Sequence, residues 1–281
     1  MQDEIRRQRR ILYIQSVLIF VLMGTVLLVS GLQVMGAAGL AVVLATAGFF
    51  VAGASEKAGE VRPGNAVPIS PAHAPQLYSV LEELTARAEL PRRPQPYLLK
   101  ASLMNAAMLG NRKNPVLVVT PMLLQTLRPA ELKAVLAHEI AHLRDNDLFS
   151  YRLAEAISMI TMVISRVGWL LLVLYMPILL VGEVRIPITI IAVLLGAPVV
   201  SVLLQMALSR SRELAADLGA VELTGQPMEL ASALQKIDNV GRSMLHQVLP
   251  VPRKRESSVF RSHPVISQRV ERLSELSETS S

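Results

Sequence analysis

The residues best suited to do chemistry lie in the segment His138–His142, which reads HEIAH. This segment belongs to an apolar-periodic run, Glu131–Leu143, that predicts a helix. Because residues four apart share one face of a helix, both imidazoles should point the same way. Two such nitrogens form half of a tetrahedral zinc site, and Glu139 would lie beside the metal, where a water would be. The surrounding residues are mostly apolar, so the helix should be buried, and buried polar groups need partners such as a metal.

A catalytic zinc needs three protein ligands and one open position, so a third ligand must come from elsewhere. His73 and His246 have no ligand spacing around them, and we interpret each as a surface histidine. The segment RELAAD offers Glu213 and Asp217, which are four apart on one helix face. Standing alone, this segment could equally be a solvated face beside two arginines.

The geometry of the chain favours Glu213 as the third ligand. Glu213 follows His142 by 71 residues, a gap filled mainly by an apolar hairpin. A tight membrane hairpin returns the chain to the side that it left. If the chain leaves the membrane near residue 205, a rise of about 1.5 Å per residue puts Glu213 about 12 Å beyond the bilayer surface, near the HEIAH helix.

Composition indicates a membrane protein. The 281 residues are 52% hydrophobic and only 4% aromatic, with a mean hydropathy of +0.43. Three apolar segments reach the roughly 20 residues that cross a bilayer, while a fourth is shorter unless it includes Arg166. We predict four spans, near Ile11–Leu32, Val34–Gly53, Val167–Val181 and Ile186–Leu208. The first could be a signal peptide, but its length and the second segment close behind favour a retained signal anchor.

Basic residues predict the orientation. All Lys and Arg residues except Arg166 and Arg185 lie before the first span, between the second and third, or after the fourth. Positive charge marks the cytoplasmic side, so both termini and the HEIAH segment should be cytoplasmic. The net charge of +6 needs no nucleic-acid partner, because basic flanks beside anionic lipid account for it. With no Cys, the chain has no disulfides and no thiol chemistry.

The fold class predicted is mainly α (α+β), with four transmembrane helices and a cytoplasmic domain that contains a small β-sheet. We expect short strands at Tyr97–Ala101 and Val116–Thr120, with turn residues at Gly110–Pro115 between them. A helix should open at Ser70-Pro71, and Pro121 and Pro129 should begin two more. The division we predict is 1–10 basic N-terminus, 11–54 two spans, 55–155 first part of the cytoplasmic domain, 156–208 membrane hairpin, and 209–281 second part with a C-terminal helix.

HEIAH followed by RELAAD after a membrane hairpin resembles the HtpX-like membrane zinc metalloproteases, within the gluzincin group. Asn105-Ala106 with Gly110 and the Val116–Thr120 segment is similar to the substrate-side segment of that family. Ser262-His263-Pro264 before a last helix is similar to its C-terminal motif. The resemblance covers most of the chain and implies a zincin-type protease domain.

The resemblance implies that His138, His142 and Glu213 hold one zinc ion per chain. Glu139 would be the general base that takes a proton from the attacking water. Asp217 would accept the N–H of a ligating histidine.

Two further roles follow from the same resemblance. Asn105 could hydrogen-bond the substrate backbone, and His263 could stabilise the tetrahedral oxyanion or could be only a loop residue before a proline-started helix.

We therefore expect an integral membrane zinc endopeptidase that cleaves polypeptides, membrane proteins among them, in quality control. Substrate should bind as an extended strand alongside residues 105–120. Two rivals remain: a prenyl-protein protease of the CAAX type, against which four spans argue, and a non-catalytic membrane scaffold with a structural metal. The sequence does not indicate the oligomeric state.

Overall fold

The computed structural model describes residues 1–56, 65–181, 186–248 and 266–278, and in it the chain forms two compact units. The mixed unit comprises Met1–Tyr13, Lys57–Leu148 and Arg210–Ser281. The helical unit comprises Ile14–Glu56 and Phe149–Ser209. His263 and the end of the membrane hairpin lie outside the described residues. The predicted assignment of these parts to cytoplasm and membrane stays a prediction.

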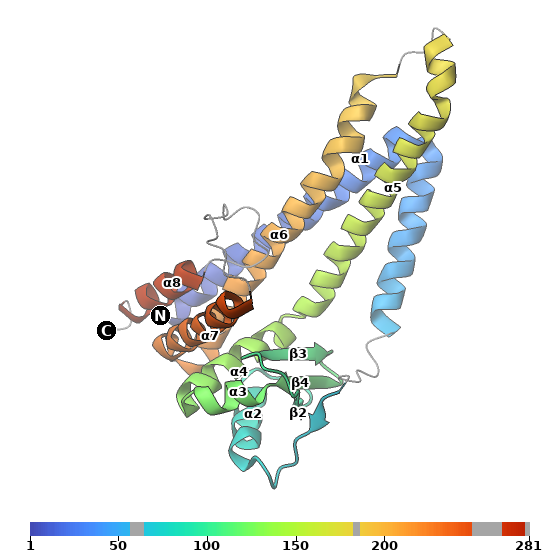
Figure 1. The fold of residues 1–281 in the computed structure, drawn as a ribbon. Coiled ribbons are helices and arrows are strands. Elements are labelled where there is room, and N and C mark those ends of the chain that lie inside the picture. Colours follow the sequence, from blue (N-terminus) through green and yellow to red (C-terminus); the bar gives the residue numbers. More distant parts are fainter. Residues whose placement is uncertain (57–64, 182–185, 249–265, 279–281) are drawn as a thin grey trace. The chain divides into compact units, whose positions relative to one another are not determined.

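The mixed unit is built around a four-stranded sheet with the order β1-β2-β4-β3. Its strands are β1 (Val67–Pro68), β2 (Gln95–Leu98), β3 (Ala106–Gly110) and β4 (Pro115–Val119). β2 and β4 are parallel, whereas β1 pairs with β2 and β3 pairs with β4 in antiparallel fashion. β3 is therefore an edge strand of this sheet, and it lies beside the HEIAH helix (Figure 1).

The two predicted strands are confirmed with ends shifted by up to three residues, but β1 and β3 were not predicted. β3 reads AAMLG, and alanine and glycine have low strand propensity, so its sequence carries little strand signal. The predicted turn at Gly110–Pro115 joins β3 to β4 rather than β2 to β4. A parallel pair such as β2 and β4 cannot be closed by a tight turn, and β3 occupies part of the crossover.

Helix α2 (Pro75–Arg87) begins later than predicted. Ser70–Ala74 forms a turn in which His73 N donates to Ser70 O at 3.1 Å. Ala74 has φ −145° and ψ 61°, outside the helical region, because a following proline disfavours helix at the residue before it. Pro75, not Pro71, therefore takes the first helical turn.

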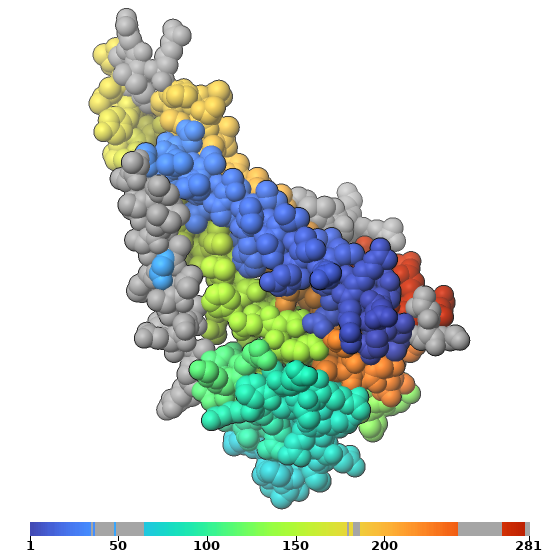
Figure 2. Space-filling view, turned by 180° about the vertical axis from the view of Figure 1, so that it is seen from behind, coloured from blue at the N-terminus to red at the C-terminus, as the bar shows by residue number. Residues whose placement is uncertain are grey.

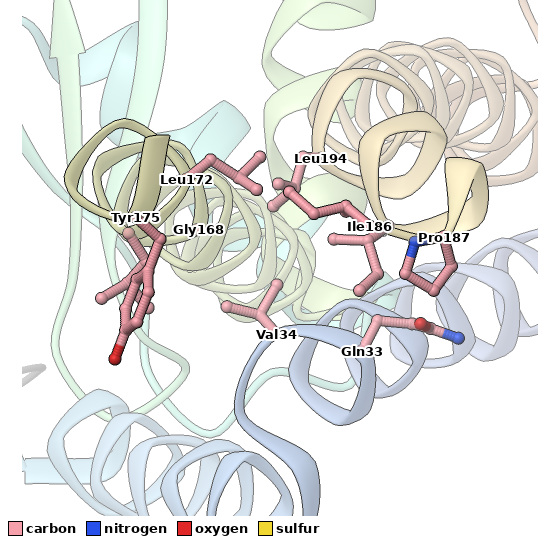
Figure 3. Close-up of a pocket in the computed structure, with 10 residues that line it drawn as sticks. Gln33, Val34, Gly168, Leu172, Tyr175, Ile186, Pro187 and Leu194 are labelled. Atoms are coloured by element: carbon pink, nitrogen blue, oxygen red, sulfur yellow. The ribbon is translucent and has the colours of Figure 1, made fainter. Parts of the chain in front are cut away.

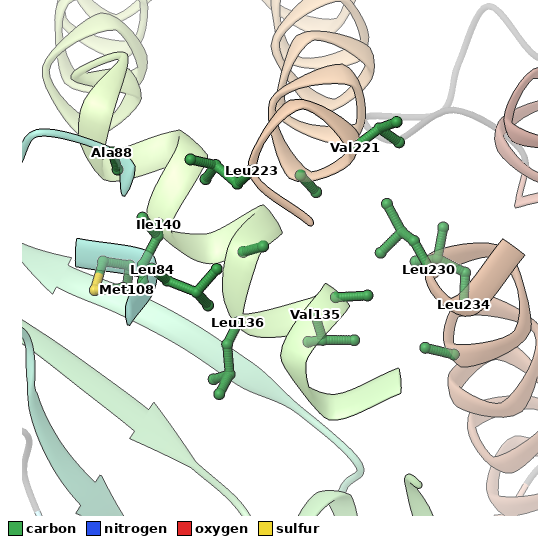
Figure 4. Packing of buried hydrophobic residues seen from close by; sticks show 14 of the residues in the cluster. Leu84, Ala88, Met108, Val135, Leu136, Ile140, Val221, Leu223, Leu230 and Leu234 are labelled. Atoms are coloured by element: carbon green, nitrogen blue, oxygen red, sulfur yellow. The ribbon is translucent and has the colours of Figure 1, made fainter. Parts of the chain in front are cut away.

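The HEIAH segment lies on α4 (Pro129–Arg144), which follows α3 (Pro121–Thr126). Both helices have proline in the first turn, as predicted. α4 packs between β3, α2 and α7 (Pro227–Val248). Figure 4 shows Leu136 and Ile140 of α4 among residues of α2, β3, α6 and α7. Leu136 and Ile140 are fully buried, so the helix that carries HEIAH is fixed by the main core.

Three helices of the described chain are long and apolar enough to cross a membrane: Gln2–Val34, Asp147–Ile178 and Ile188–Thr224. They belong to α1 (Gln2–Glu56), α5 (Asp147–Val181) and α6 (Ile188–Thr224). α1 breaks at Gly36, where φ is 58°, a left-handed conformation that glycine adopts without strain. This break separates the first two predicted spans, but a fourth span stays a prediction.

The last helices complete the mixed unit. α6 ends at Thr224, Gly225 follows with φ 69°, and Pro227 begins α7. α8 (Ile266–Glu278) is the predicted C-terminal helix and packs on α7 with Leu273 and Leu276 buried.

The first turns of α1 also belong to this unit. Ile5 is fully buried and Leu12 nearly so, both in the main core. Figure 2 shows this dark blue segment lying against the orange of α6 and α7. The basic N-terminus is thus packed against the rest of the mixed unit.

The helical unit contains an apolar cavity of about 320 Å³ (Figure 3). Leu172, Leu194 and Val34 line it, with Gln33 and Tyr175 as its polar members. At Gly168, on α5, a side chain would collide with Leu194 of α6, so this glycine permits the two helices to approach closely.

Glu131 ties the start of α4 to α7. Its carboxylate is fully buried and accepts hydrogen bonds from Arg128 N at 2.8 Å, Ser232 Oγ at 2.7 Å and Lys236 Nζ at 2.7 Å. Burial would raise the pKa of Glu131, but Lys236, Arg128 and Ser232 outweigh it and lower the pKa to about 2. The charged carboxylate is therefore a stabilising feature of this helix junction.

Glu131→Gln should lower the stability of the protein by about 2 kcal/mol at neutral pH, because the buried charge opposite Lys236 is lost. The folded pKa lies below the unfolded value, so this contribution is present above about pH 4.5 and lost as pH falls towards 2. The melting temperature of the solubilised variant should therefore lie below that of the wild type at neutral pH, and the difference should disappear as the pH falls over that range. Glu82→Gln is the control. Glu82 forms an exposed ion pair with Arg93, so this substitution should change the stability little.

Candidate active site

The turn between α4 and α5 determines what lies beside the second histidine. α4 closes with Asp145 N donating to Ala141 O at 2.9 Å. Asn146 then takes φ 57°, a left-handed conformation that asparagine tolerates better than most residues. As a result Asp147, the first residue of α5, comes next to His142.

A close approach of two helices brings the acidic segment to HEIAH. Gly219 of α6 faces Ala141 of α4, and a Cβ at Gly219 would stand 2.7 Å from the Ala141 Cβ. Only two small residues allow this spacing. Glu213 lies almost two turns earlier on α6 and is thereby placed over the histidine pair.

His138, His142 and Glu213 place one donor atom each within 4.8 Å of one another. The two Nε2 atoms are 3.1 Å apart, and the Glu213 carboxylate oxygens lie 3.6 Å from His138 Nε2 and 3.7 Å from His142 Nε2. Tetrahedral zinc with bonds of about 2.0–2.1 Å would hold its donors about 3.3 Å apart. This donor set of two imidazoles and a carboxylate fits a metal ion.

The ring of His138 is oriented by Asp217, which is in turn paired with Arg269. Its Nδ1 lies 3.0 Å from Asp217 Oδ1. Arg269 of α8 donates from Nε and Nη2 to Asp217 at 2.7 and 2.6 Å, and its Nη1 lies 3.2 Å from Glu213 Oε2. The side chains of His138, Asp217, Arg269 and Glu213 are at most 11% exposed. The C-terminal helix α8 thus contributes directly to this arrangement.

His142 has a similar support. Its Nδ1 lies 2.7 Å from Asp147 Oδ2, and Arg212 Nε donates to the other oxygen of that carboxylate. With each Nδ1 facing a carboxylate, a metal bound at the two Nε2 atoms would leave the proton of each ring on Nδ1.

The charges around His138 favour a cation. Burial lowers the pKa of His138, but Asp217 and Glu213 outweigh it and raise the pKa to about 10. Arg269 also opposes the positive charge on this ring, so the carboxylates dominate. The same carboxylates would attract a divalent metal.

Glu139 lies between the donor set and the edge strand. Its Oε2 accepts a hydrogen bond from the backbone N–H of Met108 on β3, at 3.0 Å. Burial raises the pKa of Glu139, and the neighbouring histidines only partly offset this. A carboxylate with a raised pKa is a stronger proton acceptor, which suits a general base beside a metal position.

Among the other predicted site residues, the structure places Asn105 just before β3, with an exposed side chain. Its backbone is held by Thr120, whose N donates to Asn105 O at 3.1 Å. Whether Asn105 contacts substrate stays a prediction, and His263 lies outside the described residues. His73 is exposed and hydrogen-bonded to Ser70, as a surface histidine would be.

The sequence interpretation missed Asp147, Arg212 and Arg269. Asp147 lies five residues after His142, but its direction depends on the left-handed turn at Asn146. Arg212 was given no role, and only the alternative of a solvated face included it, yet it is 6% exposed and paired with Asp147. For Arg269 the signal was a basic residue on an amphipathic helix that also carries Arg272.

Similarity to known proteins agrees with this geometry. The model of the family described as Peptidase family M48 matches residues 71–277. A protein from Paenarthrobacter aurescens described as "Protease HtpX homolog" is 35% identical over 229 residues, which are 76% of each chain. One from Syntrophobacter fumaroxidans with the same description is 32% identical and covers 74% of this chain and 78% of its own. "Protease HtpX homolog 2" from Methanosarcina mazei is 34% identical over 75% of each chain.

A solved structure shares the fold. The crystal structure of S. mikatae Ste24p matches with a TM-score of 0.52 over 93% of this chain at 20% identity. The match spans 64% of the Ste24p chain. At this identity the likeness concerns the fold alone. The sequence allowed two kinds of enzyme, an HtpX-like protease and a prenyl-protein protease. The similarity to HtpX homologues favours the first.

Replacing His138, His142 or Glu213 by Ala should abolish bound metal and proteolysis together, because two donors cannot hold a catalytic ion tightly. Metal content of the purified, folded variants by mass spectrometry tests this. His73→Ala is the matched control and should keep its metal. A Glu213→Ala protein that retains one tightly bound ion per chain would contradict the assignment of Glu213.

Proposed function

The chain belongs to peptidase family M48 and is a membrane metalloprotease, and we propose that it is a zinc endopeptidase that cleaves membrane-associated polypeptides at a cytoplasmic site. The observation that carries the proposal is the convergence of His138, His142 and Glu213 with Glu139 beside them. A structural zinc is usually closed by four protein ligands. Three ligands and a neighbouring carboxylate are typical of catalysis.

Zinc is the metal that we infer. Two imidazoles and one carboxylate form the ligand set of many catalytic zinc sites, and the carboxylates behind the rings raise their basicity. Bound at these three residues, zinc would polarise the scissile carbonyl and lower the pKa of a water to about 7.

Glu139 then moves the proton. Its carboxylate accepts a proton from the attacking water and delivers it to the nitrogen of the leaving amine. The Met108 amide holds Oε2, so the other oxygen, Oε1, is the one that we assign to the transfer. Asp217 and Asp147 keep the two imidazoles in the tautomer that exposes Nε2.

The edge of β3 offers a place for substrate. Met108 N–H points away from β4, and since direction alternates along a strand, the N–H groups of Ala106 and Gly110 also face outward. An extended peptide added here would pass Glu139. Strand addition uses backbone hydrogen bonds and tolerates many sequences, which suits a protease that removes misfolded proteins. Asn105 at the start of β3 would bind the same backbone.

The proposed location rests on charge. The basic N-terminus and the near absence of Lys and Arg from the short turns support cytoplasmic termini and a cytoplasmic site. Substrates would then be membrane proteins or segments close to the inner surface of the bilayer. His263 remains a candidate oxyanion donor.

Glu139→Gln tests the base. Glutamine keeps the size and can still accept from Met108 N–H, but it cannot take up the proton. Zinc should be retained and cleavage of an unfolded polypeptide should fall by about 10²–10⁴. Equal zinc content in variant and wild type is the control, and near-normal turnover would exclude Glu139 as the base.

Topology can be measured independently. A reporter fused after Gly182 should indicate the extracytoplasmic side, and one fused after Ser281 the cytoplasm, because an even number of spans separates the basic N-terminus from the C-terminus. Paired phosphatase and fluorescent-protein fusions give opposite signals on the two sides. A cytoplasmic signal at Gly182 would mean that Val167–Val181 does not cross.

A further inference from the structure

A second cavity, of about 320 Å³, lies in the mixed unit. α1 lines it with Arg9, Arg10 and Tyr13, and the rest of its wall includes Asp145 and Arg212. Its volume is at the lower end of the range of about 300–1,000 Å³ found for small-molecule sites. Three guanidinium groups face one carboxylate, so the lining is basic.

Two of these arginines are already paired. Arg9 Nη2 donates to both oxygens of Asp145, each at 2.8 Å, and its Nη1 donates to Glu222. Arg212 is engaged by Asp147 and by Asp145. These pairs hold one side of the cavity in a fixed geometry.

Arg10 and Tyr13 differ from them. Both side chains are exposed, and within the described part of the chain neither the Arg10 guanidinium nor the Tyr13 hydroxyl takes a hydrogen bond or ion pair. They lie three residues apart on one face of α1. The cavity thus presents unused N–H and O–H donors and an unbalanced positive charge.

The position of these donors along the chain indicates their surroundings. Arg10 immediately precedes Ile11, where the first apolar segment begins. Arg212 follows Leu208, where the last apolar segment ends, by about one helical turn. In the predicted topology both lie where membrane helices leave the hydrocarbon, the level of lipid headgroups, and tyrosine is enriched there.

We propose that this cavity binds the phosphate of an anionic lipid headgroup, with Arg10 and Tyr13 as the donors. A guanidinium matches two phosphate oxygens with two parallel N–H groups, and the phenol supplies a third bond. Free inorganic phosphate has the same chemistry, but the headgroup is concentrated at this level and basic residues attract it. The two proposed donors, Arg10 and Tyr13, take no part in peptide hydrolysis, so the proposal does not depend on the proposed function.

The test is lipid binding to the full-length, solubilised protein by native mass spectrometry, with phosphatidylglycerol and phosphatidylcholine as probes. Arg10→Gln should lower the affinity for phosphatidylglycerol about tenfold or more, because a charge-assisted pair of hydrogen bonds is lost. Arg6→Gln is the matched control. It removes the same charge from an exposed arginine one turn earlier on α1, outside the cavity, and should cost threefold or less. Tyr13→Phe should give an intermediate loss.

The remaining arms decide the identity of the ligand. Phosphatidylcholine should bind clearly more weakly than phosphatidylglycerol, and millimolar inorganic phosphate should leave the lipid bound. Equal losses in Arg10→Gln and Arg6→Gln would overturn the proposal in favour of diffuse attraction. Displacement by inorganic phosphate would overturn the lipid as ligand. Melting temperature and metal content of each variant verify that the fold is intact.

Discussion

Compensation of buried negative charge is the constraint on which the arrangement around the HEIAH helix depends. The side chains of Glu213, Asp217 and Asp147 are buried. A buried carboxylate without a partner costs free energy of folding. Arg269 neutralises Asp217 and approaches Glu213, while Arg212 neutralises Asp147. α4, α5, α6 and α8 each supply one part of this charge balance. The two histidines complete it, and a metal adds the positive charge that the excess of carboxylates favours.

The sequence predicts part of this well. Spacing on a helix is local, so the shared face of the two histidines and of Glu213 with Asp217 follows from the sequence alone. The start of α4 also follows, because Pro129 marks it. Such features need only the periodicity of one element.

The rest depends on contacts between distant parts of the chain. Arg212 and Asp147 are far apart in sequence, and Arg269 reaches Asp217 from a different helix. From the sequence alone, a charged residue on an amphipathic helix is predicted to face solvent, because its partner on another helix is unknown. β3 was missed for a related reason: an alanine-rich strand forms here because β4 and α4 flank it, not because of its own propensity.

The close approach of Gly219 and Ala141 has a consequence for how the protein can vary. Neither residue supplies a metal donor, and both lie where α6 and α4 touch. A single methyl group at Gly219 would separate the helices, and the reach of the Glu213 carboxylate is too short to follow. Variation between relatives should therefore be narrower at this glycine than at many residues nearer the substrate, although it carries no chemical group of its own. In this fold the separation of two helix backbones sets how far the Glu213 carboxylate lies from the two imidazoles that would share an ion with it.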